Sequence, residues 1–466
     1  MKKAIKRILS LALTALMSVA VLAGCGGGGD GGEEDAGGKI NITVSVNGSD
    51  AAEGALMQKW KQAYEVKNPN VTIAVKSFNT EYANAIMSYM RSEKNMPDIM
   101  WTTGELHSKY SEEGVFVNMK DMIAGDSSID LSDFYEASVS ATHKNSQDDG
   151  IYFMPRDYNK CVLFINKVMF RAAGFSEEEI AGLKDGWDYD KFIETCQRLR
   201  EAMDSEVNGL KASWVPVDAR MDFNAVYCSF VKHYGGEFVE DDKVDFLSEK
   251  NLNAYGQIFE LIDKNYIAEY GEKGSTTFAS YRAAMGINVR PSLPNMPTNN
   301  NYDIDFLPLP LDHVGVGCSG YAITYIAKDR VSSSEFNTEK KTNQDYAFDF
   351  LKFIVSEEGQ KIGAETGSII PVRTDMYNDA SWTAYMSADI NHEAFISSPE
   401  KDFSTSIFQD FSTKDAAILW SSIANVMGQV TMGANYPEGY KLSGYAKLKD
   451  AIQPYQNSVA NLRAVF

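Results

Sequence analysis

The chain has 466 residues, 44% of them hydrophobic and 12% aromatic, and it carries a formal net charge of −20. A chain of this length and composition is globular and has enough apolar residues for two or more cores. The acidic balance argues against nucleic acid as a partner, because phosphate binding needs clustered cations that this sequence lacks. The five histidines do not cluster, so we expect no metal site and no other cofactor.

The first 24 residues have the three parts of a secretory signal. A basic head is followed by the uncharged apolar stretch 8–21 and by the small residues LAG before Cys25. A transmembrane helix needs about 20 apolar residues and has no processing site, which disfavours a permanent anchor. The tetrapeptide LAGC resembles the lipobox of bacterial lipoproteins, and this resemblance implies a lipid on Cys25. Two or more acyl chains hold a protein on a bilayer.

Residues 25–38 form a glycine-rich stretch that we interpret as a tether. A flexible coil of this composition has an end-to-end distance of about 20 Å and spans roughly 45 Å at full stretch. Its acidic residues 33–35 would repel an anionic surface. We expect a disordered spacer with no further role.

Four cysteines remain after the signal: Cys161, Cys196, Cys228 and Cys318. They form no C-x-x-C pair and have no neighbouring histidine, so they do not indicate a metal site. Cys161 opens the apolar run CVLFI, which favours a small buried thiol over a disulfide. An exported domain can still oxidise its cysteines, and the three possible pairings stay open.

Strands and helices are predicted to alternate after the tether. The stretches 40–46, 71–75 and 98–103 have strand patterns, and helical spacing follows the first of them and again over about 81–93. This alternation predicts a parallel sheet covered on both faces, which binds ligands beyond the carboxyl ends of its strands. Those ends fall at 47–50, 78–82 and 101–105.

The pattern restarts in the second part of the chain. Helices are predicted at about 188–203, 222–234, 250–264 and 346–355, and strands within 151–170, 303–310 and 315–324. Three extended segments marked by proline indicate that the chain crosses three times between two lobes, with a hinge between them. The predicted fold class is α/β and two-lobed, with a mainly parallel sheet flanked by helices in each lobe. We assign 39–154 and 309–368 to the N-terminal lobe, and 155–308 and 369–466 to the C-terminal lobe.

Seven motifs in order resemble one family across nearly the whole mature chain. They are NPNVTIAV, MPDIMWTT, LHSKYSEEGVFVNM, YFMPRDYNKCVLFINKVMF, DGWDYDKFIETCQRL, FASYRAAMGI, and FDFLKFIVSEEGQKI with TGSIIPVRTD. The chain resembles the extracellular solute-binding proteins of ABC importers, in the family 1 branch that mostly binds carbohydrates. The resemblance implies a periplasmic-binding-protein-like fold that closes on its ligand.

Two positions depart from the family pattern. Tyr281 stands where the family often has glycine, and residues 288–290 replace a Gly-x-Trp whose ring commonly lies against a sugar face. The usual stacking ring is therefore not carried over at that position.

Sugar recognition needs planar polar side chains for paired hydrogen bonds and aromatic rings against the C–H face. We therefore select polar and aromatic residues at strand ends and crossings, where both lobes reach a cleft. The predicted ligand-binding residues are Asn47, Glu81, Trp101, Glu105, Asp157, Trp214, Asn288, Arg290, Tyr321 and Arg373. Each has a structural alternative as a turn residue, solvated helix start, packed ring or ion-pair partner. We assign Trp60, Trp187 and the helix 346–355 to the core, and Asn166 to a helix cap.

The leading hypothesis is a lipid-anchored receptor on the extracellular face of the cytoplasmic membrane. It would capture an oligosaccharide by hinge closure and present it to the permease subunits of an ABC importer, as a monomer. A surface glycosidase is a second hypothesis, but abundant acids do not place the required carboxylate pair, and His392-Glu393 is followed by Ile396 where a zinc motif needs its second histidine. A polyamine, peptide or metal as ligand is the third hypothesis.

Overall fold

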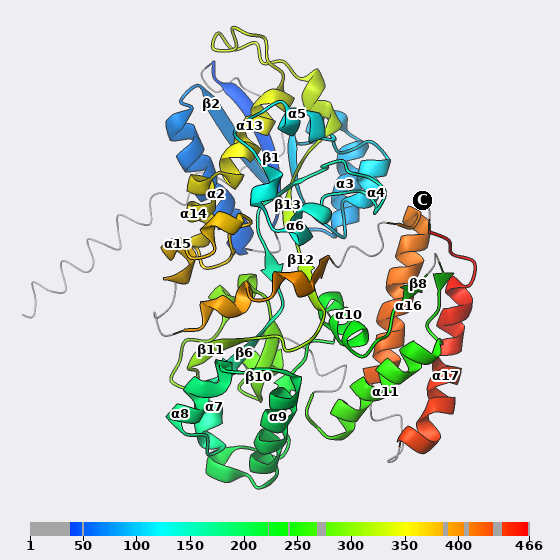
Figure 1. The fold of residues 1–466 in the computed structure, drawn as a ribbon. Helices are drawn as coiled ribbons and strands as arrows, with labels where there is room; N and C mark the ends of the chain where they lie inside the picture. Colours follow the sequence, from blue (N-terminus) through cyan, green and yellow to red (C-terminus); the bar gives the residue numbers. More distant parts are fainter. Residues whose placement is uncertain are drawn as a thin grey trace, which may run out of the picture. The chain divides into compact units, whose positions relative to one another are not determined.

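The computed structural model describes residues 38–48, 51–221, 223–240, 243–267, 276–384, 390–404, 410–431 and 440–464. The chain divides into two compact units, Met1–Lys39 and Ile40–Phe466, and the second unit is described here (Figure 1). The predicted signal, Cys25 and the tether up to residue 37 lie outside the described residues. Within the described part of the chain, no helix combines the length and the apolar character needed to cross a membrane.

The first lobe is built on a five-stranded sheet of order β2-β1-β3-β13-β4. Its strands are β1 Ile40–Asn47, β2 Val71–Phe78, β3 Ile99–Thr103, β4 Met154–Pro155 and β13 Ser319–Ile323. The first three strands are parallel, and β13 pairs antiparallel with β3 and β4. The carboxyl ends of β1, β2 and β3 therefore lie at one edge of the sheet, as the alternating sequence pattern predicts.

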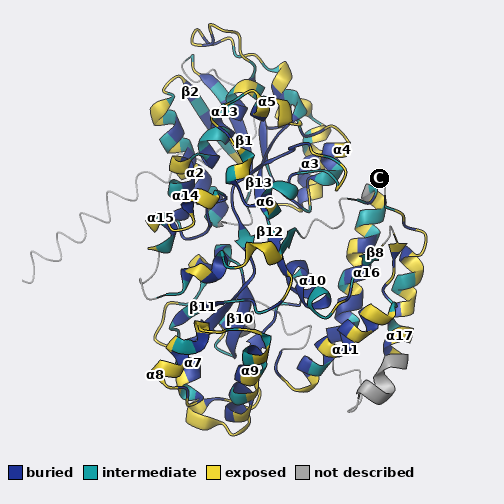
Figure 2. Ribbon diagram, in the orientation of Figure 1, coloured by how far each residue is buried: buried dark blue, intermediate teal, exposed yellow. Residues whose placement is uncertain are grey.

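Helices cover this sheet and bury its apolar side chains (Figure 2). They are α2 Ala51–Lys67, α3 Tyr82–Met90, α4 Ser108–Glu112, α5 Lys120–Ala124, α6 Glu136–Ser140, α13 Asn343–Val355 and α14 Glu357–Ala364. Trp60 of α2 is fully buried, and its indole Nε1 donates to the carbonyl oxygen of Gly359 at 2.6 Å. The assignment of Trp60 to the core is confirmed.

The second lobe contains a four-stranded sheet of order β11-β6-β10-β7. Its strands are β6 Val162–Asn166, β7 Val215–Asp218, β10 Ala283–Asn288 and β11 Ile304–Pro308. Among its neighbouring strand pairs only β10 and β7 are parallel, whereas β6 pairs antiparallel with both β10 and β11. The reason is that β6 runs away from the hinge while β10 and β11 run toward it. This sheet is therefore mixed, in contrast to the mainly parallel sheet expected for each lobe. The carboxyl ends of β7, β10 and β11 lie at the edge nearer the first lobe.

The helices of the second lobe flank this sheet and extend to one side of it (Figure 1). They are α7 Lys167–Ala172, α8 Glu177–Ala181, α9 Tyr189–Asp204, α10 Asn224–His233, α11 Glu249–Asp263, α12 Thr276–Ala279, α16 Thr413–Thr431 and α17 Tyr440–Val459, with α15 Ala380–Thr383 near the hinge. Two short strands, β8 Val239–Glu240 and β9 Lys243–Val244, pair antiparallel. Asn166 caps α7 by accepting the backbone N–H of Val168 at 3.2 Å, which confirms its predicted role. Trp187 is half-buried against the core of this lobe.

A three-stranded sheet forms the hinge between the lobes. It consists of β5 Asn159–Lys160, β12 Val314–Gly317 and β14 Asp402–Ser404, in the order β14-β12-β5. Two of the predicted crossings thus pair with each other, and the backbone N–H of Tyr158 donates to Ile370 of the third crossing at 3.2 Å. A Cβ on Gly315 would lie 2.5 Å from a backbone oxygen of α10, so this strand needs glycine to approach the helix.

The four cysteines of the described chain are free and buried. Burial raises the pKa of the Cys161 thiol to about 12. The interpretation of Cys161 as a buried thiol is confirmed.

Candidate functional site

A pocket of about 510 Å³ lies where the first lobe meets α16 of the second lobe. Its wall is formed by the start of α3, the segment after β3, α4 and the first turns of α16. The segment after β3 lies at a parallel-strand carboxyl end, where the sequence predicted ligand contacts. The pocket therefore joins a predicted binding edge of one lobe to a surface of the other.

Four aromatic rings line this pocket. They are Tyr82, Tyr110, Phe411 and Trp420. The Tyr82 and Tyr110 rings pack edge to face at 5.8 Å, and the Tyr82 hydroxyl donates to the Thr102 hydroxyl at 2.7 Å. The side chain of Trp420 remains 38% exposed. An exposed indole beside fixed tyrosine rings provides the flat apolar surface that the C–H face of a sugar requires.

The polar side chains of the pocket wall are Thr103, Glu105, Ser108, Lys109 and Glu112. Partial burial raises the pKa of the Glu112 carboxyl above its ordinary value. The ammonium of Lys109 lies 5.4 Å from the centroid of the Tyr110 ring, within cation–π range. The wall therefore combines positively and negatively charged hydrogen-bonding groups with aromatic surface.

Glu105 connects the two lobes at the inner side of this pocket. Its carboxylate accepts a hydrogen bond from the amide of Asn224, the first residue of α10, at 3.0 Å. Burial raises the pKa of the thiols of Cys228 and Cys318, and the negative charge of Glu105 contributes to both shifts. Glu105 therefore lies close to the hinge and to residues of the second lobe.

Arg220 and Asn288 lie at the facing edge of the second lobe. Arg220 follows β7 and has a φ of 51°, and its Nη1 donates to Asn288 Oδ1 at 3.2 Å. Asn288 ends β10 and is 2% exposed. The predicted residue Asn288 is thus held at a strand end facing the first lobe, as its place in the sequence suggested.

Four buried polar atoms on β3, β5 and β10 have no hydrogen-bond partner among the described residues. They are Trp101 Nε1, Thr103 Oγ1, Asn159 Oδ1 and Asn288 Nδ2. The first two belong to β3, the third to hinge strand β5, and the fourth to β10. A buried polar atom without a partner costs about 1–3 kcal/mol, so each of these atoms favours a ligand that supplies one.

Other predicted residues lie outside the pocket wall in the first lobe. Asn47 is half-buried at the end of β1, and Glu81 is exposed before α3. Asp157 is fully buried and accepts hydrogen bonds from the backbone N–H and the hydroxyl of Ser319, at 3.1 and 3.0 Å. The hydroxyl of the fully buried Tyr321 donates to the carboxylate of Glu53.

Arg290 and Arg373 form contacts within the protein. Arg290 is fully buried, and its guanidinium donates to the carbonyl oxygens of Gly367 at 3.0 Å and Trp382 at 2.8 Å. Burial and the charge of Arg290 lower the pKa of His392 to about 4. Arg373 forms ion pairs with the carboxylates of Asp375 at 2.7 Å and Asp133 at 3.3 Å.

Trp214 lies at the opposite end of the second sheet from the pocket. It precedes β7, whose other end carries Asp218, and its ring packs against Tyr281 at 5.4 Å. Tyr281 has a φ of 59°, a left-handed conformation that glycine adopts without strain. The backbone at this position therefore suits the glycine that the family resemblance implies here.

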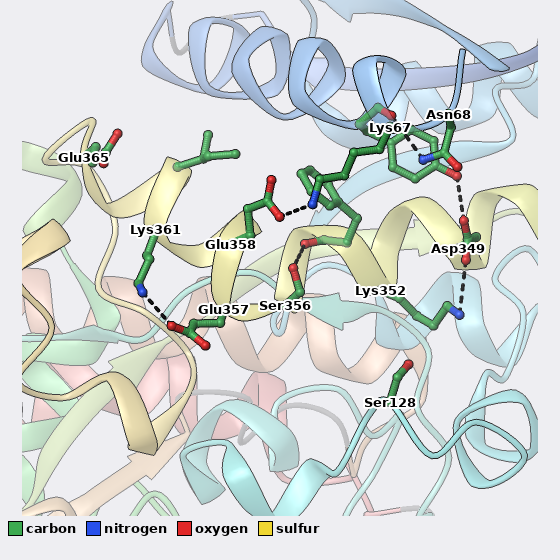
Figure 3. Close-up of a pocket in the computed structure, with 13 residues that line it drawn as sticks. Lys67, Asn68, Ser128, Asp349, Lys352, Ser356, Glu357, Glu358, Lys361 and Glu365 are labelled. Atoms are coloured by element: carbon green, nitrogen blue, oxygen red, sulfur yellow. Dashed lines mark hydrogen bonds and ion pairs between the residues drawn. The ribbon is translucent and has the colours of Figure 1, made fainter. Parts of the chain in front are cut away.

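A larger groove of about 840 Å³ lies on the first lobe alone, against α2, α13 and α14 (Figure 3). Most of its charged side chains form ion pairs: Lys67 pairs with Glu358, Lys352 with Asp349, and Lys361 with Glu357. All of its lining residues belong to the first lobe, so this groove is not the candidate site. Among the described residues no cluster of three or more His, Cys, Asp or Glu side chains is placed to hold a metal ion.

Sequence reasoning missed Trp420, Arg220 and Asn224. Arg220 and Asn224 follow a strand end in the stretch VPVDAR and beyond, which is a recognisable signal. Trp420 has none, because a tryptophan within an amphipathic helix has the same sequence pattern whether it faces the core or a cleft.

Two lobes joined by crossing strands, with a pocket and unpartnered polar atoms at their facing edges, define a hinged ligand-binding protein. The family model described as bacterial extracellular solute-binding protein matches residues 59–389. The chain belongs to this family. A search of curated proteins finds no significant match.

Several solved structures share the fold at low sequence identity. A substrate-binding protein of Listeria monocytogenes in complex with cycloalternan has a TM-score of 0.66 at 16% identity, covering 90% of this chain and 99% of that chain. The GacH receptor of Streptomyces glaucescens, solved without ligand and with acarbose, has a TM-score of 0.66 at 17% sequence identity, and the match covers 91% of this chain and 99% of that chain. UgpB from Mycobacterium tuberculosis, in complex with glycerophosphocholine, has a TM-score of 0.66 at 15% sequence identity, and the match covers 90% of this chain and 98% of that chain. These likenesses confirm the two-lobed periplasmic-binding-protein fold.

Proposed function

We propose that this protein is the lipid-anchored substrate-binding component of an ABC importer and that it captures a carbohydrate, most favourably an oligosaccharide, by hinge closure. The observation that supports this proposal is the set of unpartnered polar atoms on β3, β5 and β10, one of which, Thr103 Oγ1, belongs to a residue that lines an aromatic pocket. Sugar hydroxyls both donate and accept, so they can satisfy Trp101 Nε1 as well as Asn159 Oδ1. The structural neighbours bound to cycloalternan and acarbose are consistent with such a ligand.

In this proposal each lobe contributes one part of the contact. The first lobe supplies Trp101, Thr103 and Glu105, and the second supplies Trp420 and Asn288. A ligand that contacts both sets only when the lobes are closed binds the closed state more tightly, and binding therefore shifts the hinge equilibrium toward closure.

The remaining parts of the proposal concern location and partners. Cys25 would carry the lipid on the extracellular face of the cytoplasmic membrane, and the glycine-rich segment 25–38 would let the receptor reach its permease subunits. The receptor would act as a monomer and without catalysis. Mass spectrometry of the membrane-extracted protein tests the anchor, because a Cys25→Ala variant should lose the acyl mass.

The test of the function is thermal unfolding of the full exported chain with Cys25→Ala against a panel of oligosaccharides. A ligand at 100 times its Kd stabilises the folded state by about 2.7 kcal/mol, which should raise the Tm by a few degrees. Polyamines, short peptides and glycerophosphocholine form the comparison arm, because one structural neighbour holds a ligand of that last kind. A shift with these compounds alone would reject the sugar and retain the receptor.

A pair of variants locates the site. Trp420→Ala removes the 38% exposed indole of the pocket, whereas Tyr377→Ala removes a 52% exposed ring elsewhere. Loss of one stacked aromatic side chain should weaken binding roughly tenfold at Trp420 and leave it unchanged at Tyr377. Equal affinities for both variants would place the sugar outside this pocket.

A further inference from the structure

Exposed apolar side chains line the interlobe pocket and continue onto the helix surface beside it. Nine large hydrophobic side chains are exposed among the described residues, and Leu106 and Trp420, at 36% and 38%, line the pocket itself. Exposed apolar groups that gather beside a binding cavity indicate a ligand or partner with apolar surface.

The surface of α3 continues this apolar character away from the pocket. Ala83 lines the pocket, and Met87 and Met90 follow it at i+4 and i+7, which places all three on one face of the helix. Met87 is 45% exposed and Met90 is 38% exposed. Four of the nine exposed large hydrophobic side chains therefore lie in the pocket wall or on the helix face that leads out of it.

The opposite side of the pocket mouth is apolar as well. Ala416 and Trp420 are four residues apart on α16 and both line the pocket, so one face of this helix is turned toward the cavity. Ala417 adds a small side chain beside them. The small alanines leave room between α3 and α16, while the methionines can adapt to differently shaped apolar groups.

We propose that the ligand is a glycoside whose apolar aglycone, an aryl or alkyl group, lies along the Ala83, Met87 and Met90 face of α3 while its sugar occupies the pocket. This inference rests on the proposed function, because it assigns a second part of the same ligand to a surface continuous with the same pocket. The aglycone gains affinity from the apolar area that it and the methionines remove from water.

Matched pairs of methyl and phenyl glycosides test this inference. The probes are the methyl and phenyl glycosides of glucose, maltose, cellobiose and xylobiose, titrated calorimetrically into the full exported chain with Cys25→Ala, with the free sugars alongside. The phenyl member of a binding pair should have a Kd at least about tenfold lower than its methyl partner. Equal Kd values for the two members would overturn the inference while leaving a sugar receptor in place.

Variants place the effect on α3. Met87→Ser together with Met90→Ser should reduce the phenyl-to-methyl ratio of affinities to within about twofold, because serine offers little apolar surface. Val66→Ser on α2 is the matched control, since Val66 is 82% exposed and lies outside the pocket wall, and it should keep the full ratio. A ratio that survives the double methionine replacement would overturn the assignment to α3.

Two further outcomes are distinguishable. If neither the free sugars nor any glycoside binds, the proposed function fails, and the inference fails with it. If sedimentation shows a dimer that the methionine replacements dissociate, a second copy of the chain covers this surface, and the aglycone is rejected.

Discussion

Arg290 offers a direct test of whether a polar residue predicted from sequence binds ligand or holds the fold. Its guanidinium is fully buried and donates to the carbonyl oxygens of Gly367 and Trp382, which belong to the third crossing and to α15. The perturbation is Arg290→Met, which keeps much of the side-chain length and removes every donor.

The expected magnitude follows from the two carbonyl groups that lose this donor. A buried carbonyl left without a hydrogen bond costs about 1–3 kcal/mol, so the loss in free energy of unfolding is about 2–6 kcal/mol. This is a large part of a total stability of about 5–15 kcal/mol. The matched control is Arg373→Met, whose ion pairs with Asp375 and Asp133 lie nearer the surface and should contribute below about 1 kcal/mol.

The assay is equilibrium unfolding in urea, followed by calorimetric titration of the folded variant with a sugar from the panel. The denaturation midpoint should fall for Arg290→Met and stay nearly unchanged for Arg373→Met, while the folded Arg290 variant keeps its affinity within about twofold. An Arg290→Met protein with unaltered stability and no ligand binding would refute the structural role and return Arg290 to the site.

Three further predictions concern stability. Gly315→Ala should lower the free energy of unfolding, measured in urea, by about 1–3 kcal/mol, because the added Cβ would lie 2.5 Å from a backbone oxygen of α10. The control is Gly54→Ala, whose added Cβ meets no atom within 4 Å and should not destabilise the protein. Burial lowers the pKa of His107 to about 3, so the neutral imidazole contributes its full stabilisation above the ordinary pKa of 6.5. Below pH 6.5 the free energy of unfolding should fall by up to about 1.4 kcal/mol per pH unit, because the unfolded chain binds a proton that the folded chain does not. Unfolding measured over a pH series for this protein and for His107→Gln checks this, and parallel curves for the two proteins would contradict it. Asp402→Asn removes one partner of the buried ion pair with Lys160 at 2.6 Å and should lower the free energy of unfolding by about 3–5 kcal/mol. The joint replacement Lys160→Met with Asp402→Leu should lower it by less, because no buried charge is left without a partner. Equal losses in chemical unfolding would show that the ion pair is not the cause.

Much of the secondary structure of both lobes was predictable because it follows from local patterns. The alternation over 40–46 became β1 Ile40–Asn47, and the helix expected at about 188–203 is α9 Tyr189–Asp204. Asn166 was recognisable as a cap because a helix start has a short-range chemical signature. The helices α16 and α17 were not predicted, although they carry Trp420.

The candidate site was only partly predictable, because burial depends on residues far apart in the chain. Glu105 and Asn288 were selected at strand ends and do lie at the facing edges of the lobes. Asp157 was selected on the same argument, yet it accepts hydrogen bonds from Ser319 and is enclosed by the hinge. Nothing in the local sequence distinguishes a carboxylate that meets a ligand from one that meets a backbone N–H 162 residues away.

The amino-acid sequence by itself predicted an export signal, many of the strands and helices, and the two lobes of the fold, because each of these predictions depends on the periodicity and composition of short segments. Only the tertiary structure decided that two crossings pair as a hinge sheet, that β6 runs against its neighbours, and that Trp420 faces a cavity with Tyr82. These features are set by which distant segments pack together, and the free energy of that packing is a property of the whole chain.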